Sequence, residues 1–234
     1  MTLLRLLGKT GAVIRVEMSR KKNLRLEQRE EIGRALSLDE ESRLLSGAKA
    51  ARSPFMYPVV SIGLNTGMRD TEIRTLRWEQ LNFSQRILTV GKSKTRAGTG
   101  RTIPLNEELV LVLSQYAEWY RTRIGPTLPS NYLFPFGRAQ HWDPTRPVTT
   151  LKTAWQNLKR TVQVECRFHD LRHTCGTKLA ETDASDETIM SIMGHVSRRM
   201  LTHYSHIRTE HKRRALEVIS TKRAEEKSRI ARVR

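Results

Sequence analysis

The chain has 234 residues, 38% hydrophobic and 28% charged, which is enough apolar material for one sizeable folded domain with extensions. Its 42 lysines and arginines against 24 acidic residues give a formal net charge of +18, and this excess points to a polyanion, first of all nucleic acid, as the partner. Two cysteines argue against a disulfide framework, and the absence of a long apolar stretch, a lipidation signal or a convincing signal peptide argues against a membrane protein, so a reducing cytoplasm is expected.

The first 36 residues are basic and weakly patterned, which predicts an arm or linker that contacts phosphate or simply keeps the chain soluble. Folded structure is expected from Ser37, which forms a capping-box pattern with Glu40 and opens a helix that buries Leu44 and Leu45. A second, apolar helix is predicted over residues 54–65, and Thr66-Gly67 ends it.

A short third helix is expected next, and its start carries the first candidate site residues. Arg69 lies in the turn, and Asp70 is predicted to cap the short helix, which turns Ile73 and Leu76 to one face. Glu72 follows Arg69 by three residues and is predicted to orient its guanidinium. A carboxylate in the first turn of a helix is also favoured by the helix dipole alone.

Two strands are predicted over residues 86–90 and 101–105, joined by a basic, glycine-rich hairpin loop with the sequence G-K-S-K-T-R-A-G-T-G. Lys92, Lys94 and Arg96 in this loop are candidates for contacting DNA, and a flexible loop suits an element that orders on binding. A solvated charged loop is the plainer interpretation, above all for Lys92 and Arg96.

Helical patterns return after the hairpin. Asn106 is predicted to cap an amphipathic helix over residues 107–124, and a proline-rich connection over 126–147 follows, with its aromatic residues assigned to packing. A further helix from Thr149 to about Val162 displays three cations that either contact backbone phosphate or are simply solvated: Lys152, Lys159 and Arg160.

The segment from His169 to Tyr204 carries the chemistry. It reads H-D-L-R-H at 169–173, on a predicted helix, then G-H at 194–195 after a helix capped by Ser185, then T-H-Y-S-H at 202–206. Histidine transfers protons near neutral pH, arginine binds phosphate oxygens two at a time, and a tyrosine hydroxyl can attack phosphorus. Each residue alone has a plainer explanation, but the ordered set indicates phosphoryl transfer.

These motifs resemble the C-terminal catalytic domain of the tyrosine recombinases, the phage-integrase family. T-G-M-R-D-T-E-I at 66–73 resembles the family's first arginine box and S-K-T at 93–95 its lysine element, and the resemblance runs from about Leu36 to about Ile219. It implies a mainly α fold with a small antiparallel β-sheet (α+β). It also implies a site-specific, integrase-like DNA recombinase that cuts and rejoins DNA through a 3′-phosphotyrosine, without ATP, metal or another cofactor.

The resemblance assigns catalytic roles to six residues: Arg69, Lys94, His169, Arg172, His195 and Tyr204. Arg69 and Arg172 would grip the non-bridging oxygens of the scissile phosphate. His169 would accept and return a proton, and His195 would hydrogen-bond the phosphate. Tyr204 would attack while Lys94 protonates the departing 5′-hydroxyl.

The expected organisation is a basic arm over residues 1–36, a catalytic domain over 37–220 and a charged tail over 221–234. The helical core-binding domain that usually precedes the catalytic domain in the family is missing, so the chain is a fragment, is catalytic-domain-only, or works with a partner that supplies that domain. Double-stranded DNA is the expected partner, in a bacterial or phage-encoded, nucleoid-associated setting. A tetramer on DNA is expected through the C-terminal segment (Ala215, Leu216, Val218 and Ile219), unless that segment packs within its own chain.

Three alternatives stay open at this point. His169 and His173 are spaced i,i+4 and resemble a metal site, but the glutamate of H-E-x-x-H is missing and a neighbouring arginine disfavours a cation. A type IB topoisomerase shares the tyrosine chemistry without a defined target. A catalytically silent DNA-binding relative would retain the fold alone.

Overall fold

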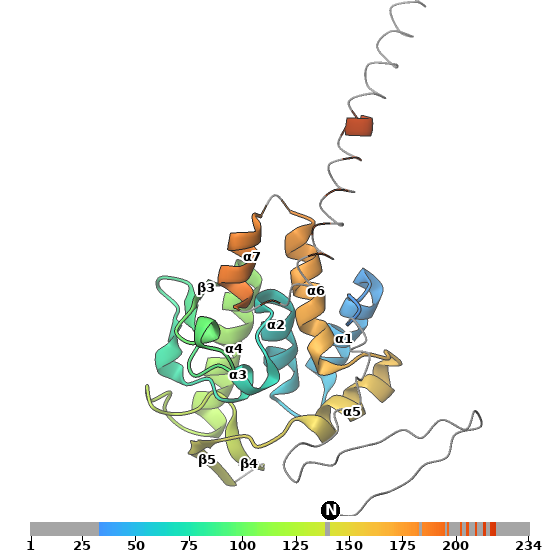
Figure 1. Ribbon diagram of the computed structural model, residues 1–234. Helices are drawn as coiled ribbons and strands as arrows, with labels where there is room; N and C mark the ends of the chain where they lie inside the picture. Colours follow the sequence, from blue (N-terminus) through green and yellow to red (C-terminus); the bar gives the residue numbers. More distant parts are fainter. Residues whose placement is uncertain are drawn as a thin grey trace, which may run out of the picture. The chain divides into compact units, whose positions relative to one another are not determined.

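The computed structural model describes residues 33–138, 141–182, 184–194 and 196, and seven further positions (202, 205, 209, 213 and 216–218). The predicted arm up to residue 32, His195, Tyr204 and most of the C-terminal segment therefore lie outside the described residues. The described chain is mainly helical with two small antiparallel sheets, which confirms the predicted fold class (Figure 1).

The predicted capping box starts the first helix, α1 (Leu38–Ala50). The Ser37 hydroxyl accepts from the Glu40 N–H at 3.2 Å, and the Glu40 carboxylate accepts from the Ser37 N–H at 2.9 Å. The packed chain begins before this cap, because Leu36 is buried and its N–H donates to the Thr174 hydroxyl at 2.9 Å.

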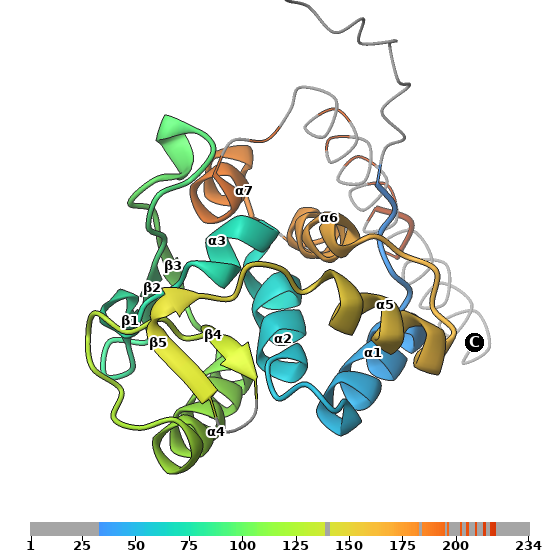
Figure 2. The ribbon, with the colours of Figure 1, turned by 90° about the horizontal axis from the view of Figure 1, so that it is seen from below.

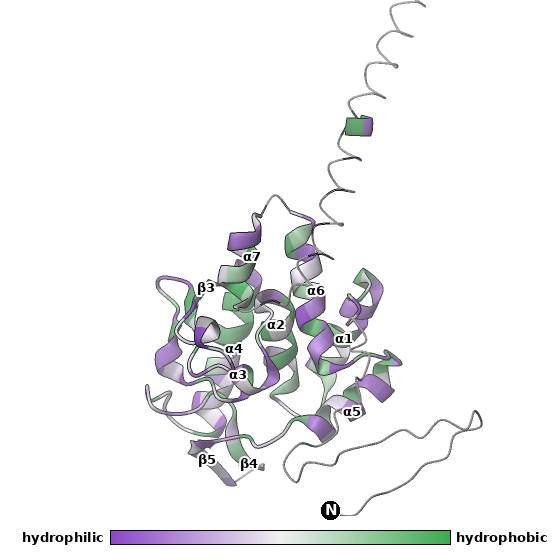
Figure 3. Ribbon diagram, in the orientation of Figure 1, coloured by the Kyte–Doolittle hydropathy of each residue, from purple (hydrophilic) through white to green (hydrophobic). Residues whose placement is uncertain are grey.

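The second helix, α2 (Met56–Thr66), is the centre of the packing. It is apolar nearly all round and contacts α1, α4 (Glu107–Arg123) and α6 (Phe168–Ala180), as Figures 2 and 3 show. Gly67 ends it in the left-handed conformation, with φ of 61°, which a glycine adopts without steric cost. The short α3 (Asp70–Arg74) follows at once.

Both predicted strands are present. β2 (Ile87–Thr89) pairs antiparallel with β3 (Thr102–Pro104), with Leu88 opposite Ile103, and a two-residue strand that was not predicted, β1 (Leu81–Asn82), pairs with β2 on its other side. Leu88 and Ile103 are both buried, so this pair of side chains faces the core.

A second sheet replaces part of the predicted proline-rich connection. β4 (Pro135–Arg138) and β5 (His141–Pro147) pair antiparallel, with Pro135 opposite Pro147. Prolines lack the N–H that a sheet interior needs, which is why the pattern did not indicate strands. A two-stranded sheet has only edges, where prolines are tolerated.

The caps of α4 and α7 (Asp186–Met193) are the predicted ones, whereas α5 (Lys152–Val162) begins at Lys152 and not at Thr149 as predicted. Asn106 caps α4 by accepting from the Leu109 N–H, and Ser185 caps α7 by accepting from the Thr188 N–H. α5 lies between them in the chain and buries Trp155 and Leu158. None of the helices in the described ranges combines the length and the apolar character that a membrane crossing requires.

Aromatic rings fill the space between α2, α4 and the second sheet. This aromatic cluster consists of Phe55, Trp78, Tyr116, Trp119, Tyr120, Phe134 and Trp142. Phe134 is fully buried, and its ring centroid lies 5.7 Å from that of Phe55 and 5.5 Å from that of Tyr116. Of the two aromatic residues in the sequence Y-L-F-P at 132–135, Phe134 is a packing residue as predicted, whereas Tyr132 is only partly buried and lines a cavity.

Candidate active site

The start of α3 holds Arg69 in place. Arg69 is the N-cap residue, its N–H donates to the Glu72 carboxylate at 3.0 Å, and its guanidinium contacts the same carboxylate at 3.1 Å. Glu72 thus lies where the sequence placed it, against Arg69. The prediction that Asp70 caps this helix is wrong. It is the first helical residue and pairs with Arg74 at 2.8 Å, because Glu72 already satisfies the terminal N–H.

Glu72 is buried and is shared between segments. Its carboxylate accepts from the Arg101 guanidinium at 2.8 Å and from the Ser93 hydroxyl, in addition to Arg69. Burial alone would raise the pKa of Glu72. The hydrogen bonds from Arg101, Ser93 and the Arg69 N–H outweigh burial and lower that pKa to about 2. Glu72 is therefore ionised at neutral pH, and one carboxylate faces two arginines.

Arg172 lies on α6 and is almost completely buried, with 2% of its surface exposed. One terminal nitrogen donates to the Gly67 carbonyl at 2.6 Å and to the Met193 carbonyl at 2.7 Å. Both carbonyls belong to helix C-terminal ends, where backbone oxygens lack helical partners and the helix dipole is negative. Arg172 therefore joins the turn before Arg69 to the end of α7.

His169 lies in the first turn of α6 and keeps an exposed side. Desolvation lowers the pKa of its imidazole to about 4, and the neighbouring His173, Arg172 and Arg69 act in the same direction. The ring is therefore neutral at pH 7 and able to accept a proton. The His169 and His173 rings meet edge to face at 5.0 Å, and the described residues contain no group of three metal-binding side chains.

Arg69 and His169 line the same cavity, of about 320 Å³. Thr150, just before α5, and Lys152, the first residue of α5, line it as well, together with apolar residues that include Trp155. Lys152 is thus brought to the candidate site. Lys159 and Arg160 are not, because they lie about two helical turns further along α5.

The two more distant cations of α5 are engaged with neighbours. The Lys159 side chain is 11% exposed and lies 3.5 Å from the Glu165 carboxylate. Arg160 donates to the Asn157 side chain at 2.6 Å. Their contact with DNA stays a prediction.

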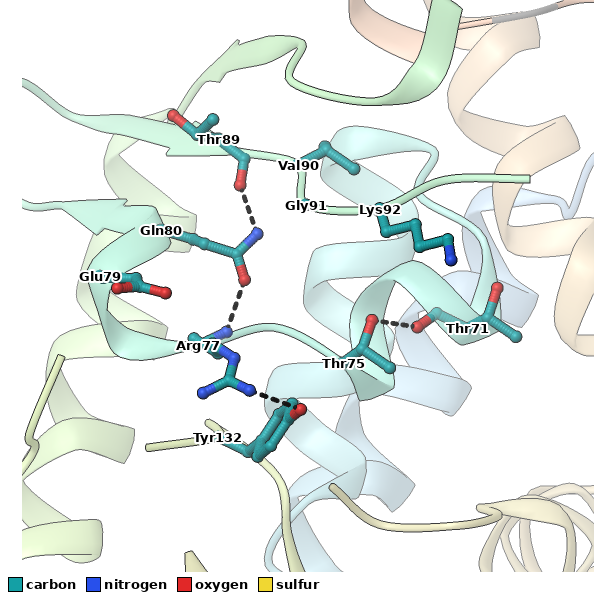
Figure 4. Close-up of a pocket in the computed structure, with 10 residues that line it drawn as sticks. All are labelled: Thr71, Thr75, Arg77, Glu79, Gln80, Thr89, Val90, Gly91, Lys92 and Tyr132. Carbon is teal, nitrogen blue, oxygen red and sulfur yellow. Dashed lines mark hydrogen bonds between the residues drawn. The ribbon is translucent and has the colours of Figure 1, made fainter. Parts of the chain in front are cut away.

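The loop between β2 and β3 carries three exposed cations, Lys92, Lys94 and Arg96. Lys92 lines a larger cavity of about 700 Å³ together with Thr71 of α3 and Thr75, the residue that follows α3 (Figure 4). Arg77 lies on the wall of this cavity, where its guanidinium lies 4.2 Å from the centre of the Tyr132 ring and donates to the Tyr132 hydroxyl. The cavity beside α3 therefore has both signs of charge on its wall, Arg77 and Lys92 against Glu79.

Arg101 is the residue that sequence reasoning missed. Its side chain is 6% exposed, and it contacts Glu72, the Gly98 carbonyl and the Ile192 carbonyl. A signal was present, since Arg101, Ile103 and Leu105 alternate along one predicted strand, and that alternation places all three on the inner face. A buried arginine needs partners, so its inward position indicated a polar cluster.

Comparison with known proteins identifies the family. The profile of the phage integrase family matches residues 34–211. Tyrosine recombinase XerA of Pyrococcus furiosus is 30% identical over 162 residues, which cover 68% of this chain and 52% of that protein. The chain thus spans about half the length of this curated relative.

Solved structures agree with this match. The crystal structure of XerA recombinase superposes with a TM-score of 0.61 and 25% identity over 79% of this chain and 64% of that chain. The Tn1549 transposon integrase, solved in complex with a circular intermediate DNA, gives a TM-score of 0.59 and 24% identity over 76% of this chain and 63% of that chain. The fold is therefore that of a tyrosine recombinase catalytic domain.

Proposed function

The chain belongs to the phage integrase family, and we propose that it is the DNA-cleaving part of a site-specific recombinase that works through a covalent 3′-phosphotyrosine. The observation that carries this proposal is the cavity lined by Arg69, His169 and Lys152, which is backed by the buried Arg172 and Glu72. Such a cavity offers positive charge and a neutral imidazole to one phosphate, and phosphoryl transfer asks the protein for little else.

The reaction divides into two balanced steps. In the first, the Tyr204 oxygen bonds to phosphorus while the bond to the 5′-oxygen breaks. His169 accepts the tyrosine proton, and Lys94 donates a proton to the departing 5′-hydroxyl. Arg69, Arg172 and His195 stabilise the charge on the non-bridging oxygens. In the second step, a 5′-hydroxyl gives its proton to Lys94 and bonds to phosphorus while the bond to the Tyr204 oxygen breaks. His169 returns its proton to the departing tyrosine, so the phosphodiester is restored without ATP.

Three findings support double-stranded DNA as the substrate. The net charge is +18, the basic loop from Lys92 to Arg96 is exposed, and a structural relative was solved with DNA. A cytoplasmic, nucleoid-associated location follows from that substrate. Lys92, Arg96 and Lys152 are the proposed contacts to phosphate, with Lys159 and Arg160 as weaker candidates.

Assembly through the C-terminal segment is part of the same proposal. Leu216 is 68% exposed and Val218 53% exposed, as expected of side chains that pack on a surface outside their own chain. Ala215 and Ile219 lie outside the described residues. A partner or a preceding segment would supply the remaining half of a DNA clamp.

A covalent trap tests the proposed function. Wild type and Tyr204→Phe are incubated with a library of nicked DNA duplexes in EDTA, and adducts are separated on a denaturing gel. The proposal predicts an EDTA-resistant adduct with wild type that is absent with Tyr204→Phe. Trapped ends that share one sequence indicate a recombinase, and scattered ends indicate a topoisomerase. DNA binding without any adduct from wild type would contradict the proposal.

A further inference from the structure

We propose that Arg101 is a positioning residue that holds the loop of Lys94 and the end of α7 in place relative to Arg69. This proposal rests on the proposed function. Arg101 stands at the start of β3, and β3 contacts α7. Arg101 belongs neither to the arginine box at 66–73 nor to the lysine element at 93–95. Its role follows from where its three guanidinium nitrogens donate.

The Arg101 guanidinium donates to three different segments, and Nη1 contacts the Glu72 carboxylate at 3.4 Å in addition to the bonds that follow. Nη2 donates to the Glu72 carboxylate at 2.8 Å, Nη1 to the Gly98 carbonyl at 2.7 Å, and Nε to the Ile192 carbonyl at 2.9 Å. These partners lie on α3, in the loop between β2 and β3, and on α7. The guanidinium spreads its donors over three nitrogens in fixed directions and so reaches three separated groups, whereas the three donors of a lysine ammonium share one nitrogen.

The loop is braced on both sides of Lys94. The Ser93 hydroxyl donates to the Glu72 carboxylate, and the Ser93 N–H donates to the Thr99 hydroxyl at 3.0 Å. On the far side, Gly98 is held by Arg101. The stretch that carries Lys94 is thus anchored to Glu72 and Arg101 at its base, while Lys94 itself is exposed.

Two glycines let the loop lie directly against the end of α7. A Cβ on Gly98 would lie 2.4 Å from the Ser93 hydroxyl and 3.1 Å from Nη1 of Arg101. A Cβ on Gly194 would lie 3.1 Å from the Gly98 Cα, and Gly194 has a φ of 73°. The two backbones therefore approach each other closely, and the Arg101 side chain lies against both glycines.

Two consecutive carbonyls at the end of α7 each accept a hydrogen bond from an arginine. Arg101 donates to the Ile192 carbonyl and Arg172 to the Met193 carbonyl. These oxygens have no partner within the helix and lie at its negative end. Gly194 follows, and His195 is the next residue in the sequence. Arg101 thus aligns the loop of one proposed catalytic residue with the backbone that leads to another.

Arg101→Lys is the decisive variant, because it keeps the positive charge and removes the fork. Arg121→Lys is the matched control, since Arg121 forms an exposed pair with Glu118 on α4. Each protein cleaves two nicked duplexes, one with the normal 5′-oxygen at the scissile phosphate and one with sulfur in its place. With sulfur, the tyrosine oxygen bonds to phosphorus, the P–S bond breaks, and the thiolate leaves with the electron pair without needing the proton from Lys94.

The expected result is a selective defect. Arg101→Lys should cleave the oxygen substrate about 10- to 100-fold more slowly than wild type. On the sulfur substrate the same variant should recover most of the rate, with unchanged DNA affinity, while Arg121→Lys matches wild type on both substrates. Ser93→Ala removes one brace of the loop and leaves the buried ion pair intact. It should show the same pattern to a smaller degree, and it keeps the test open if Arg101→Lys folds poorly.

Two outcomes would overturn the role of Arg101. One is an equal loss on both substrates for both Arg101→Lys and Ser93→Ala, which indicates general structural damage. The other is wild-type rates for both variants on the oxygen substrate. Wild type that forms no adduct with either substrate would instead overturn the proposed function itself, so the two failures are distinguishable.

Discussion

Two buried regions of this protein are held together in different ways. In the aromatic cluster, Phe55 meets four other rings at centroid distances between 5.1 and 6.4 Å, and the contacts are many and weakly directional. In the polar cluster of Glu72, Ser93, Arg101 and Arg172, each contact is made by one or two directed hydrogen bonds between separate segments. We expect the aromatic cluster to contribute to stability alone, and the polar cluster to contribute to stability and also to fix the geometry of the candidate site.

The largest expected effect on stability comes from the aromatic cluster. Phe134→Ala removes a fully buried ring and should lower the free energy of unfolding by about 4 kcal/mol, through lost burial and a residual cavity. Urea unfolding measures the loss. The cleavage rate per folded molecule should stay near that of wild type. If Phe134→Ala instead lost cleavage activity with little loss of stability, the aromatic cluster would have the role that we assign to the polar cluster.

Glu72→Gln should lower the free energy of unfolding by about 3 kcal/mol at pH 7, because it removes the charge that pairs with buried Arg101. The folded-state pKa of Glu72 lies near 2, below the ordinary value of 4.5. Its contribution is therefore fully present above pH 4.5 and is lost as the pH falls towards 2. Unfolding of both proteins between pH 2 and 7 measures this. A gap between them that does not narrow in acid would contradict the assigned ionisation.

Lys152→Ala tests the rim of the polar region. Lys152 lines the cavity of Arg69 and His169, so its loss should weaken DNA binding a few-fold and reduce the slope of log affinity against log salt by about 1. Lys49→Ala, which changes an exposed lysine on α1, is the matched control and should leave the slope unchanged. If the slope of log affinity against log salt were equal for the two variants, Lys152 would not be one of the contacts to DNA.

The mildest test is a titration without mutation. The His169 imidazole should titrate near pH 4 in the free protein, as measured by NMR, because desolvation and neighbouring cations disfavour its charged form. A bound phosphodiester adds negative charge beside the ring, so the pKa should rise when DNA is added. A pKa near 6.5 that does not respond to DNA would separate His169 from the phosphate site.

Local patterns predicted much of the fold. The capping box at Ser37, the cap at Asn106 and the alternation of β2 and β3 each depend on neighbours in the sequence, and all are present. The hairpin of β4 and β5 was missed because its prolines oppose strand formation. Its pairing depends on the two strands meeting, which no single strand pattern encodes.

The candidate site was predicted in its residue types and only partly in its connections. The contact between Glu72 and Arg69 is local, with a spacing of three residues, so the sequence indicated it. The contact between Arg172 and Gly67 spans 105 positions, and that between Arg101 and Ile192 spans 91. Such pairs are set by how α2, α6 and α7 pack together, so they became visible only in the folded chain.

Mass mapping of a trapped protein–DNA adduct tests most directly whether one tyrosine of this chain carries the cut strand. Wild type is trapped on a nicked duplex in EDTA, digested with protease and nuclease, and the modified peptide is sequenced by mass spectrometry. The result predicted here is a nucleotide attached through its 3′-phosphate to Tyr204. An adduct on another residue, or attachment through a 5′-phosphate, would contradict the mechanism.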